Sequence, residues 1–132
     1  MIQFEHFALN VEQPHEIADW YVRTLGCQVL LKMEAEPHTV FLADANGRVF
    51  WELYKNSKAQ MSRVCHGDPA VFHVAVAVDD LDEVKSKVWE AGGTFVEEVR
   101  TDSGSVLLMM RDPWGIALQL CSRVPPFVGG GG

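Results

Sequence analysis

The sequence predicts an α+β fold that consists of two tandem βαβββ modules. In each half of the 132-residue chain, one strand signal and one helix signal are followed by three further strand signals. The two halves align without a gap at a single offset of 67 positions. The identical pairs with this separation include His6 and His73, Gly26 and Gly93, Val29 and Val96, and Leu53 and Leu120. A repeat of this kind is typical of a duplicated structural unit.

The first module opens with a strand signal over Phe4–Val11. An amphipathic helix is predicted over His15–Leu25, where apolar residues recur every four positions. Gly26 ends this helix, because glycine readily adopts the left-handed conformation of a helix C-cap. The Asn46-Gly47 pair predicts a hairpin turn between the last two strands. The three strand signals after the helix are Gln28–Met33, Thr39–Ala43 and Arg48–Tyr54.

The second module repeats this order. A strand is predicted over Val71–Val78 and a helix over Leu81–Ala91, with Asp79 or Asp80 as its N-cap. The last three strand signals are Thr94–Arg100, Ser105–Met110 and Ile116–Cys121. We expect one domain over residues 1–123, with modules at about 1–55 and 70–122, a linker at 56–69 and a flexible tail at 124–132.

Charge and hydropathy exclude several classes of partner. The formal net charge of −7 disfavours nucleic acid, because phosphate binding needs a basic surface. No apolar run reaches the ~18 residues of a membrane span, so we expect no membrane partner. Glu5 and His6 stand where a secretion signal would be apolar, which predicts a cytoplasmic protein. Cys27, Cys65 and Cys121 lack CxxC spacing and are expected to be free thiols.

Four polar side chains interrupt otherwise apolar strands at repeated positions: His6, Glu52, His73 and Gln119. Glu52 lies 46 positions after His6, and Gln119 lies 46 positions after His73. Burying a carboxylate is costly unless it is paired or binds a metal. Two histidines, a carboxylate and an amide oxygen suit a divalent transition metal, so we predict one ion at these residues without distinguishing Zn, Ni, Co, Fe or Mn. The remaining histidines are expected at the surface: His15, His38 and His66.

Residues two positions apart on a strand share a face, which identifies further candidate residues. Four side chains share faces with the predicted ligands and are expected to bind substrate: Phe4, Phe50, Tyr54 and Cys121. The opposite face is apolar and should pack on the helices: Phe7, Trp51, Leu53, Val74, Leu118 and Leu120.

Over Ile2–Ser122 the chain resembles the vicinal oxygen chelate superfamily, which includes glyoxalase I, fosfomycin-resistance proteins, bleomycin-binding proteins and extradiol dioxygenases. Six short motifs carry the resemblance: His6 in the opening strand, Trp20-Tyr21 with Leu25-Gly26, Trp51-Glu52-Leu53, His73 with Asp79-Asp80-Leu81, Glu90-Ala91-Gly92-Gly93, and Arg111-Asp112-Pro113-Trp114-Gly115. The resemblance implies that the two sheets curl into a mixed-sheet cup around the metal, within one chain or across a homodimer.

By position, the resemblance assigns the family's four metal-ligand places to His6, Glu52, His73 and Gln119. The first three match bacterial glyoxalase I. Gln119 departs from it, because glyoxalase I has a glutamate there that acts as a catalytic base, and an amide cannot take a proton. Glu52 is therefore the candidate catalytic base.

Three functions are compatible with these residues. The first is a glyoxalase-like lyase or isomerase, in which the metal holds two adjacent substrate oxygens and stabilises an enediolate or enolate. The second is a ring-cleaving or other iron-dependent dioxygenase, for which His6, His73 and Glu52 supply two histidines and one carboxylate. The third is a metal-free protein that binds a small molecule such as an antibiotic. We also expect a homodimer, because exposed sheet edges favour pairing.

Overall fold

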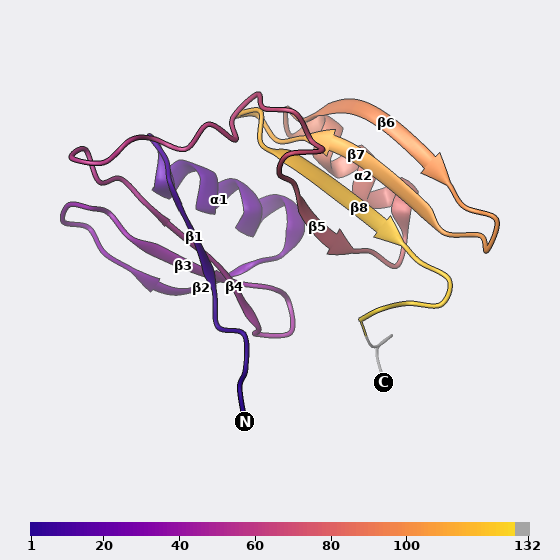
Figure 1. Ribbon diagram of the computed structural model, residues 1–132, viewed down its shortest axis with the longest axis horizontal. Helices are drawn as coiled ribbons and strands as arrows, with labels where there is room; N and C mark the ends of the chain where they lie inside the picture. The colour runs from indigo at the N-terminus through magenta and orange to yellow at the C-terminus, as the bar shows by residue number, and fades with distance from the viewer. Residues whose placement is uncertain (129–132) are drawn as a thin grey trace. The chain divides into compact units, whose positions relative to one another are not determined.

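The computed structural model describes residues 1–128, and the chain divides into two compact units (Figure 1). The first unit is Met1–Ser62, and the second begins at Arg63, within the predicted linker. Each unit contains one βαβββ module, which confirms the predicted α+β fold with two tandem modules. Residues 129–132 of the predicted tail lie outside the described residues.

The first module is a four-stranded mixed sheet with one helix. Its elements are β1 (Phe7–Asn10), α1 (Pro14–Leu25), β2 (Gln28–Lys32), β3 (Val40–Ala43) and β4 (Val49–Tyr54). The strand order is β1-β4-β3-β2, with β1 parallel to β4 and the other neighbours antiparallel. The helix α1 contacts β2, β3 and β4. As predicted, Gly26 ends α1 in the left-handed conformation, with a φ of 72°.

The second module has the same topology. Its elements are β5 (Val74–Ala77), α2 (Leu81–Glu90), β6 (Thr94–Arg100), β7 (Val106–Arg111) and β8 (Ala117–Ser122). The strand order is β5-β8-β7-β6, and β5 is parallel to β8. The helix α2 contacts β6 and β8. Of the two predicted N-caps, the structure selects Asp80, whose Oδ1 accepts a hydrogen bond from the backbone N–H of Glu83 at 3.1 Å.

The turn between β3 and β4 and the turn between β7 and β8 have the same hydrogen-bond pattern. The carboxylate of Asp44 accepts hydrogen bonds from the backbone N–H groups two and four residues further on, at 2.9 and 3.0 Å. The carboxylate of Asp112 makes the same two bonds, also at 2.9 and 3.0 Å. These turns fix where β4 and β8 begin. They therefore set the register of the two strands that carry Glu52 and Gln119.

The predicted helix-facing sides of the two sheets are buried. The ring of Trp51 packs against the ring of Tyr21 in α1, with the two ring centroids 5.1 Å apart. Burial of such large apolar side chains is a main source of stability. Successive strand side chains alternate between faces, so Glu52 and Gln119 are held on the sides away from the helices. Four residues of β4 and β8 are 0 % exposed: Trp51, Leu53, Leu118 and Leu120. Phe7, predicted for the same face, is only half-buried.

Candidate metal-binding half-sites

In the first module, the parallel pairing of β1 and β4 brings His6 and Glu52 together. Ala8 pairs with Glu52, and His6 immediately precedes β1 on the same face as Ala8. The Nε2 atom of His6 lies 3.4 Å from Oε1 of Glu52. The two side chains are 29 % and 22 % exposed, so the pair is sheltered but remains accessible.

The ring of His6 is held on both sides. Its Nδ1 lies 2.8 Å from Oε1 of Glu5, and the edge of its ring meets Phe41 of β3 with centroids 5.1 Å apart. A carboxylate only accepts hydrogen bonds, so in the neutral ring Nδ1 carries the hydrogen and Nε2 keeps its lone pair. Two electron-pair donors, Nε2 of His6 and the Glu52 carboxylate, therefore converge on one point. Such a point suits a cation.

In the second module, His73 stands in the equivalent place, immediately before β5. Its Nδ1 lies 2.8 Å from the carbonyl oxygen of Pro69. The carbonyl accepts, so Nδ1 donates and Nε2 of the neutral ring keeps its lone pair. Metal-binding histidines almost always donate their second ring N–H to a carbonyl or carboxylate in this way. Both predicted ligand histidines of the chain, His6 and His73, have that arrangement.

Gln119 occupies the place in β8 that Glu52 has in β4, and it pairs with Ala75 of β5. The thiol of Cys121, two residues further along the same face, donates a hydrogen bond to Oε1 of Gln119 at 3.3 Å. Burial raises the pKa of the Cys121 thiol, although Arg123 opposes this shift, so the thiol is a donor at neutral pH. Cys121 therefore orients the amide and is not a reactive thiolate. All three cysteines are free, as expected.

The predicted substrate-binding residues divide into two groups. Phe50 and Tyr54 lie on β4 and are half-buried, on the same face as Glu52. Phe4 lies before β1 and is 75 % exposed, so it belongs to no strand face, contrary to the strand predicted from Phe4. Two further residues, which the sequence patterns did not identify, pair directly with the predicted ligands: Phe41 with Glu52 and Met109 with Gln119. The alternation of β3 around the buried Val40 and Leu42 could have indicated Phe41.

The donor set fits a divalent transition metal in its chemistry. It offers imidazole nitrogens with free lone pairs, one carboxylate and one amide oxygen, which are ligands of this class of ion. Within single modules, the structure brings together His6 with Glu52 and Gln119 with Cys121. Among residues 1–128, no three His, Cys, Asp or Glu side chains cluster closely enough to hold a metal ion.

The sequence model of the Glyoxalase/Bleomycin resistance protein/Dioxygenase superfamily matches residues 3–120. The chain belongs to this superfamily. Solved structures agree with the superfamily fold. TioX from Micromonospora sp. ML1 is 23% identical, with a TM-score of 0.65 over 90% of this chain and 97% of that chain.

A lactoylglutathione lyase from Agrobacterium tumefaciens is 19% identical, with a TM-score of 0.64 over 90% of this chain and 92% of that chain. A glyoxalase-related enzyme from Fulvimarina pelagi is 16% identical, with a TM-score of 0.71 over 100% of this chain and 96% of that chain. At these identities the structural likeness shows the fold. No curated protein matches the sequence.

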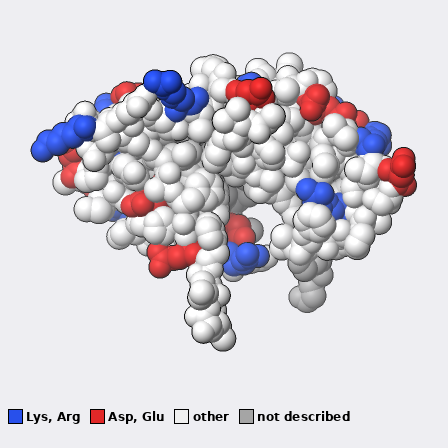
Figure 2. Space-filling model, viewed as in Figure 1, with Lys and Arg blue, Asp and Glu red and all other residues white. Residues whose placement is uncertain are grey.

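Charged side chains are dispersed over the face of this superfamily member that Figure 2 shows. Acidic side chains are scattered among uncharged ones on the face shown in Figure 2, and the basic side chains there form no continuous area. Neither helix within residues 1–128 has the length and apolar character that crossing a bilayer requires. Proteins of this fold bind small-molecule substrates.

Proposed function

We propose that the protein is a glyoxalase-like, metal-dependent lyase or isomerase that acts on a small substrate with adjacent oxygens. The observation that carries this proposal is the convergence of Nε2 of His6 and Oε1 of Glu52 at 3.4 Å, with the other ring nitrogen of His6 already engaged by Glu5. The same strand register repeats in the second module at His73 and Gln119. Together these residues form the ligand set of one divalent ion.

His6, Glu52, His73 and Gln119 would hold the ion, which supplies a Lewis acid that polarises two neighbouring substrate oxygens. Glu52 is the protein's proton carrier in this proposal, because it is the single carboxylate of the four. A base of this kind removes a proton from one carbon and returns it to the next, which contributes about 10²- to 10⁴-fold to the rate. Phe41, Phe50 and Tyr54 lie beside Glu52 and would exclude water from the substrate.

The proton-transfer role of Glu52 predicts that Glu52→Gln lowers proton exchange at the substrate carbon by about 10²-fold or more. The probe is hydroxypyruvate, an anion with adjacent oxygens, and NMR in D2O reads exchange at its hydroxymethyl carbon. Glu90→Gln, at the exposed end of α2, makes the same chemical change on the helix side of the second sheet. Metal content is measured for both variants, so that loss of the ion is separated from loss of the base. Full exchange by metal-loaded Glu52→Gln would rule out this role.

The purified parent protein can also be tested for the other two functions that the sequence leaves open. Oxygen uptake with a catechol by the iron-loaded protein would identify a dioxygenase, because neither a lyase nor a binding protein consumes oxygen. Equal affinity for an aromatic cation with and without metal would identify a metal-free binding protein. The lyase or isomerase proposal predicts that both measurements are negative.

We also propose a homodimer that forms through an exposed sheet edge. β2 and β6 are edge strands, and every residue in both is exposed. Leu30 and Leu31 of β2 are 52 % and 50 % exposed, and an unprotected apolar edge favours pairing with another chain. Light scattering at micromolar concentration should give twice the mass of one chain.

The positive charge that Leu30→Lys introduces on β2 should shift the dimer–monomer equilibrium toward the monomer. The control is Val71→Lys, which adds the same charge at an apolar residue that is 83 % exposed and lies outside the strands. A monomer at all concentrations of the parent protein would refute the dimer. An equal effect of both lysines would refute the role of β2.

A further inference from the structure

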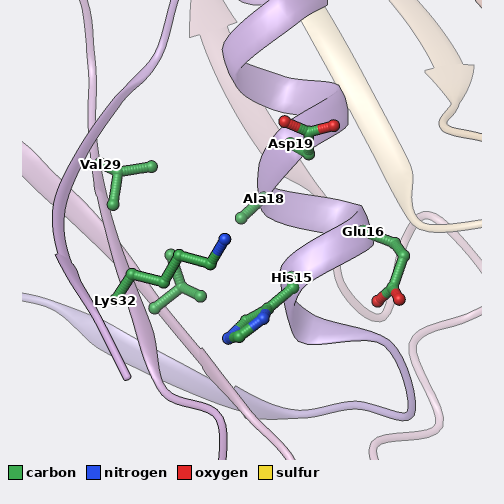
Figure 3. Close-up of a pocket in the computed structure, with 7 residues that line it drawn as sticks. His15, Glu16, Ala18, Asp19, Val29 and Lys32 are labelled. Atoms are coloured by element: carbon green, nitrogen blue, oxygen red, sulfur yellow. The ribbon is translucent and has the colours of Figure 1, made fainter. Parts of the chain in front are cut away.

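A second cluster of polar side chains lies in the first module, on the face of the sheet that α1 covers. It surrounds a cavity of about 310 Å³ between α1, β2 and β3 (Figure 3). The buried Val40 lines this cavity, whereas Phe41 and Glu52 lie on the other face of the sheet. The cavity is therefore separate from the half-site of His6 and Glu52.

Two histidines meet beside this cavity. The rings of His15, in the first turn of α1, and His38, in the loop before β3, are perpendicular, with centroids 5.6 Å apart. A ring nitrogen about 2.1 Å from a metal ion places the ring centroid roughly 3 Å from the ion, so two histidines on one ion have centroids about 5–6 Å apart. The spacing of the two rings is therefore compatible with a shared ion.

The hydrogen bond of the His15 ring is one that metal-binding histidines make. Nε2 of His15 lies 3.0 Å from the carbonyl oxygen of Met33, so Nε2 donates and Nδ1 of the neutral ring keeps its lone pair. The backbone N–H of Met33 in turn donates to the carbonyl of Thr39 at 2.8 Å, which ties together the two ends of the loop that carries His38. His38 adopts a left-handed backbone with a φ of 58°. Such conformations cluster at functional sites, where the surrounding structure maintains them.

The charged side chains around the pair largely compensate one another, so the imidazole nitrogens and not the net charge favour a cation. Glu16, Asp19 and Lys32 line the cavity. Asp19 lies 3.2 Å from Nε of Arg23. The Lys32 ammonium is itself 3.8 Å from the Glu34 carboxylate. Figure 3 shows the His15 ring and the end of the Lys32 side chain on the same side of α1, whereas the Glu16 side chain points away from them. The open cavity leaves space for water beside the His15 ring, which lines it.

We propose that His15 and His38 form a second metal site, which takes a divalent ion of the nickel, copper or zinc type through two imidazole nitrogens, with water completing its coordination. These ions prefer imidazole donors and lie at the tight-binding end of the divalent series. The site has two protein ligands, against four at the first site, so it binds its ion more weakly and exchanges it more readily. This proposal is independent of the proposed enzymatic function.

The test uses untagged, full-length protein in which His6→Ala and His73→Ala remove the first site. Ni²⁺ is the probe, because it does not oxidise the three free cysteines, and calorimetry reads its binding. We expect about one Ni²⁺ per chain. His15→Gln or His38→Asn, each added to this background, should weaken binding at least about tenfold. Asparagine is chosen at position 38 because it tolerates a left-handed backbone.

His66→Gln, a change at the remaining histidine in the other unit, is the matched control and should leave Ni²⁺ affinity unchanged. Proton NMR gives a second readout: paramagnetic Ni²⁺ should broaden the ring signals of His15 and His38 before that of His66. Circular dichroism verifies that each variant is folded. No Ni²⁺ binding by the background protein, or equal binding by the folded His15→Gln and His38→Asn variants, would overturn the second site and would leave the first site unaffected.

Discussion

Replacing both His6 and His73 by alanine is expected to weaken the tightest binding of a divalent ion by more than about 100-fold. Loss of a hydrogen bond to a ligand alone costs about 10- to 100-fold in metal affinity, and this variant removes two ligands. Hydrogen bonds to Glu5 and to the carbonyl of Pro69 already orient the rings of His6 and His73. Calorimetry with Ni²⁺ measures the effect as loss of the tight binding event, while the weaker event proposed for His15 and His38 persists.

His66→Ala is the control for this double variant, because it removes a histidine that is not among the proposed ligands. Each single variant separates the modules: His6→Ala leaves Glu52 without its neighbour, whereas His73→Ala leaves that pair intact. Tight binding that survives in His73→Ala, but not in His6→Ala, would mean that the first module binds the ion by itself. Unchanged tight binding in the double variant would show that these residues are not the ligands.

Gln119→Glu is expected to raise turnover of the hemithioacetal of methylglyoxal and glutathione by about 10- to 100-fold over a parent activity that is weak or absent. The change supplies a second carboxylate at the position where Gln119 departs from glyoxalase I, and a positioned base contributes on the order of 10²-fold or more. A carboxylate also still accepts the hydrogen bond that Cys121 donates to Gln119 at 3.3 Å. The substitution therefore changes charge and basicity with little change of packing.

The charge of the site should change the ligand preference in the opposite direction. With Gln119, a divalent ion and Glu52 leave a net charge near +1, whereas with glutamate the site is neutral. The parent should therefore bind carboxylates and enolates more tightly than Gln119→Glu does. Gln119→Ala separates loss of the amide from gain of charge. Strong turnover of the hemithioacetal by the parent would show that Glu52 alone is sufficient, and equal carboxylate affinity in both proteins would contradict the charge argument.

The element order could be predicted from the sequence because period-two and period-four apolar patterns, glycine C-caps and turn residues all agreed. The ends of the first strands could not. Strand signals begin at Phe4 and Val71, but β1 and β5 begin at Phe7 and Val74. Phe7 pairs with Trp51, whereas β4 itself begins two residues earlier at Val49, so the pairing of β1 stops before its partner strand ends. Where such pairing stops depends on contacts between distant parts of the chain, which local apolar patterns do not encode.

The candidate site could likewise be predicted only in part from the sequence. The pairs of His6 with Glu52 and of Gln119 with Cys121 follow from strand alternation and the repeat, and the structure brings each pair together. The ring orientations do not follow from these patterns. They depend on the side-chain rotamer of Glu5 and on the path of the chain at Pro69. Phe41 was missed because its contact with His6 depends on the hairpin register, which the bulge between β3 and β4 shifts.

We propose that His6, Glu52, His73 and Gln119 hold one divalent ion. The most direct test is metal analysis of untagged parent protein that is purified without chelator and then desalted, beside the same preparation of the His6→Ala, His73→Ala variant. We expect about one tightly held divalent ion per chain in the parent and almost none in the variant. A parent that holds no ion, and binds added Ni²⁺ no more tightly than the variant does, would contradict it.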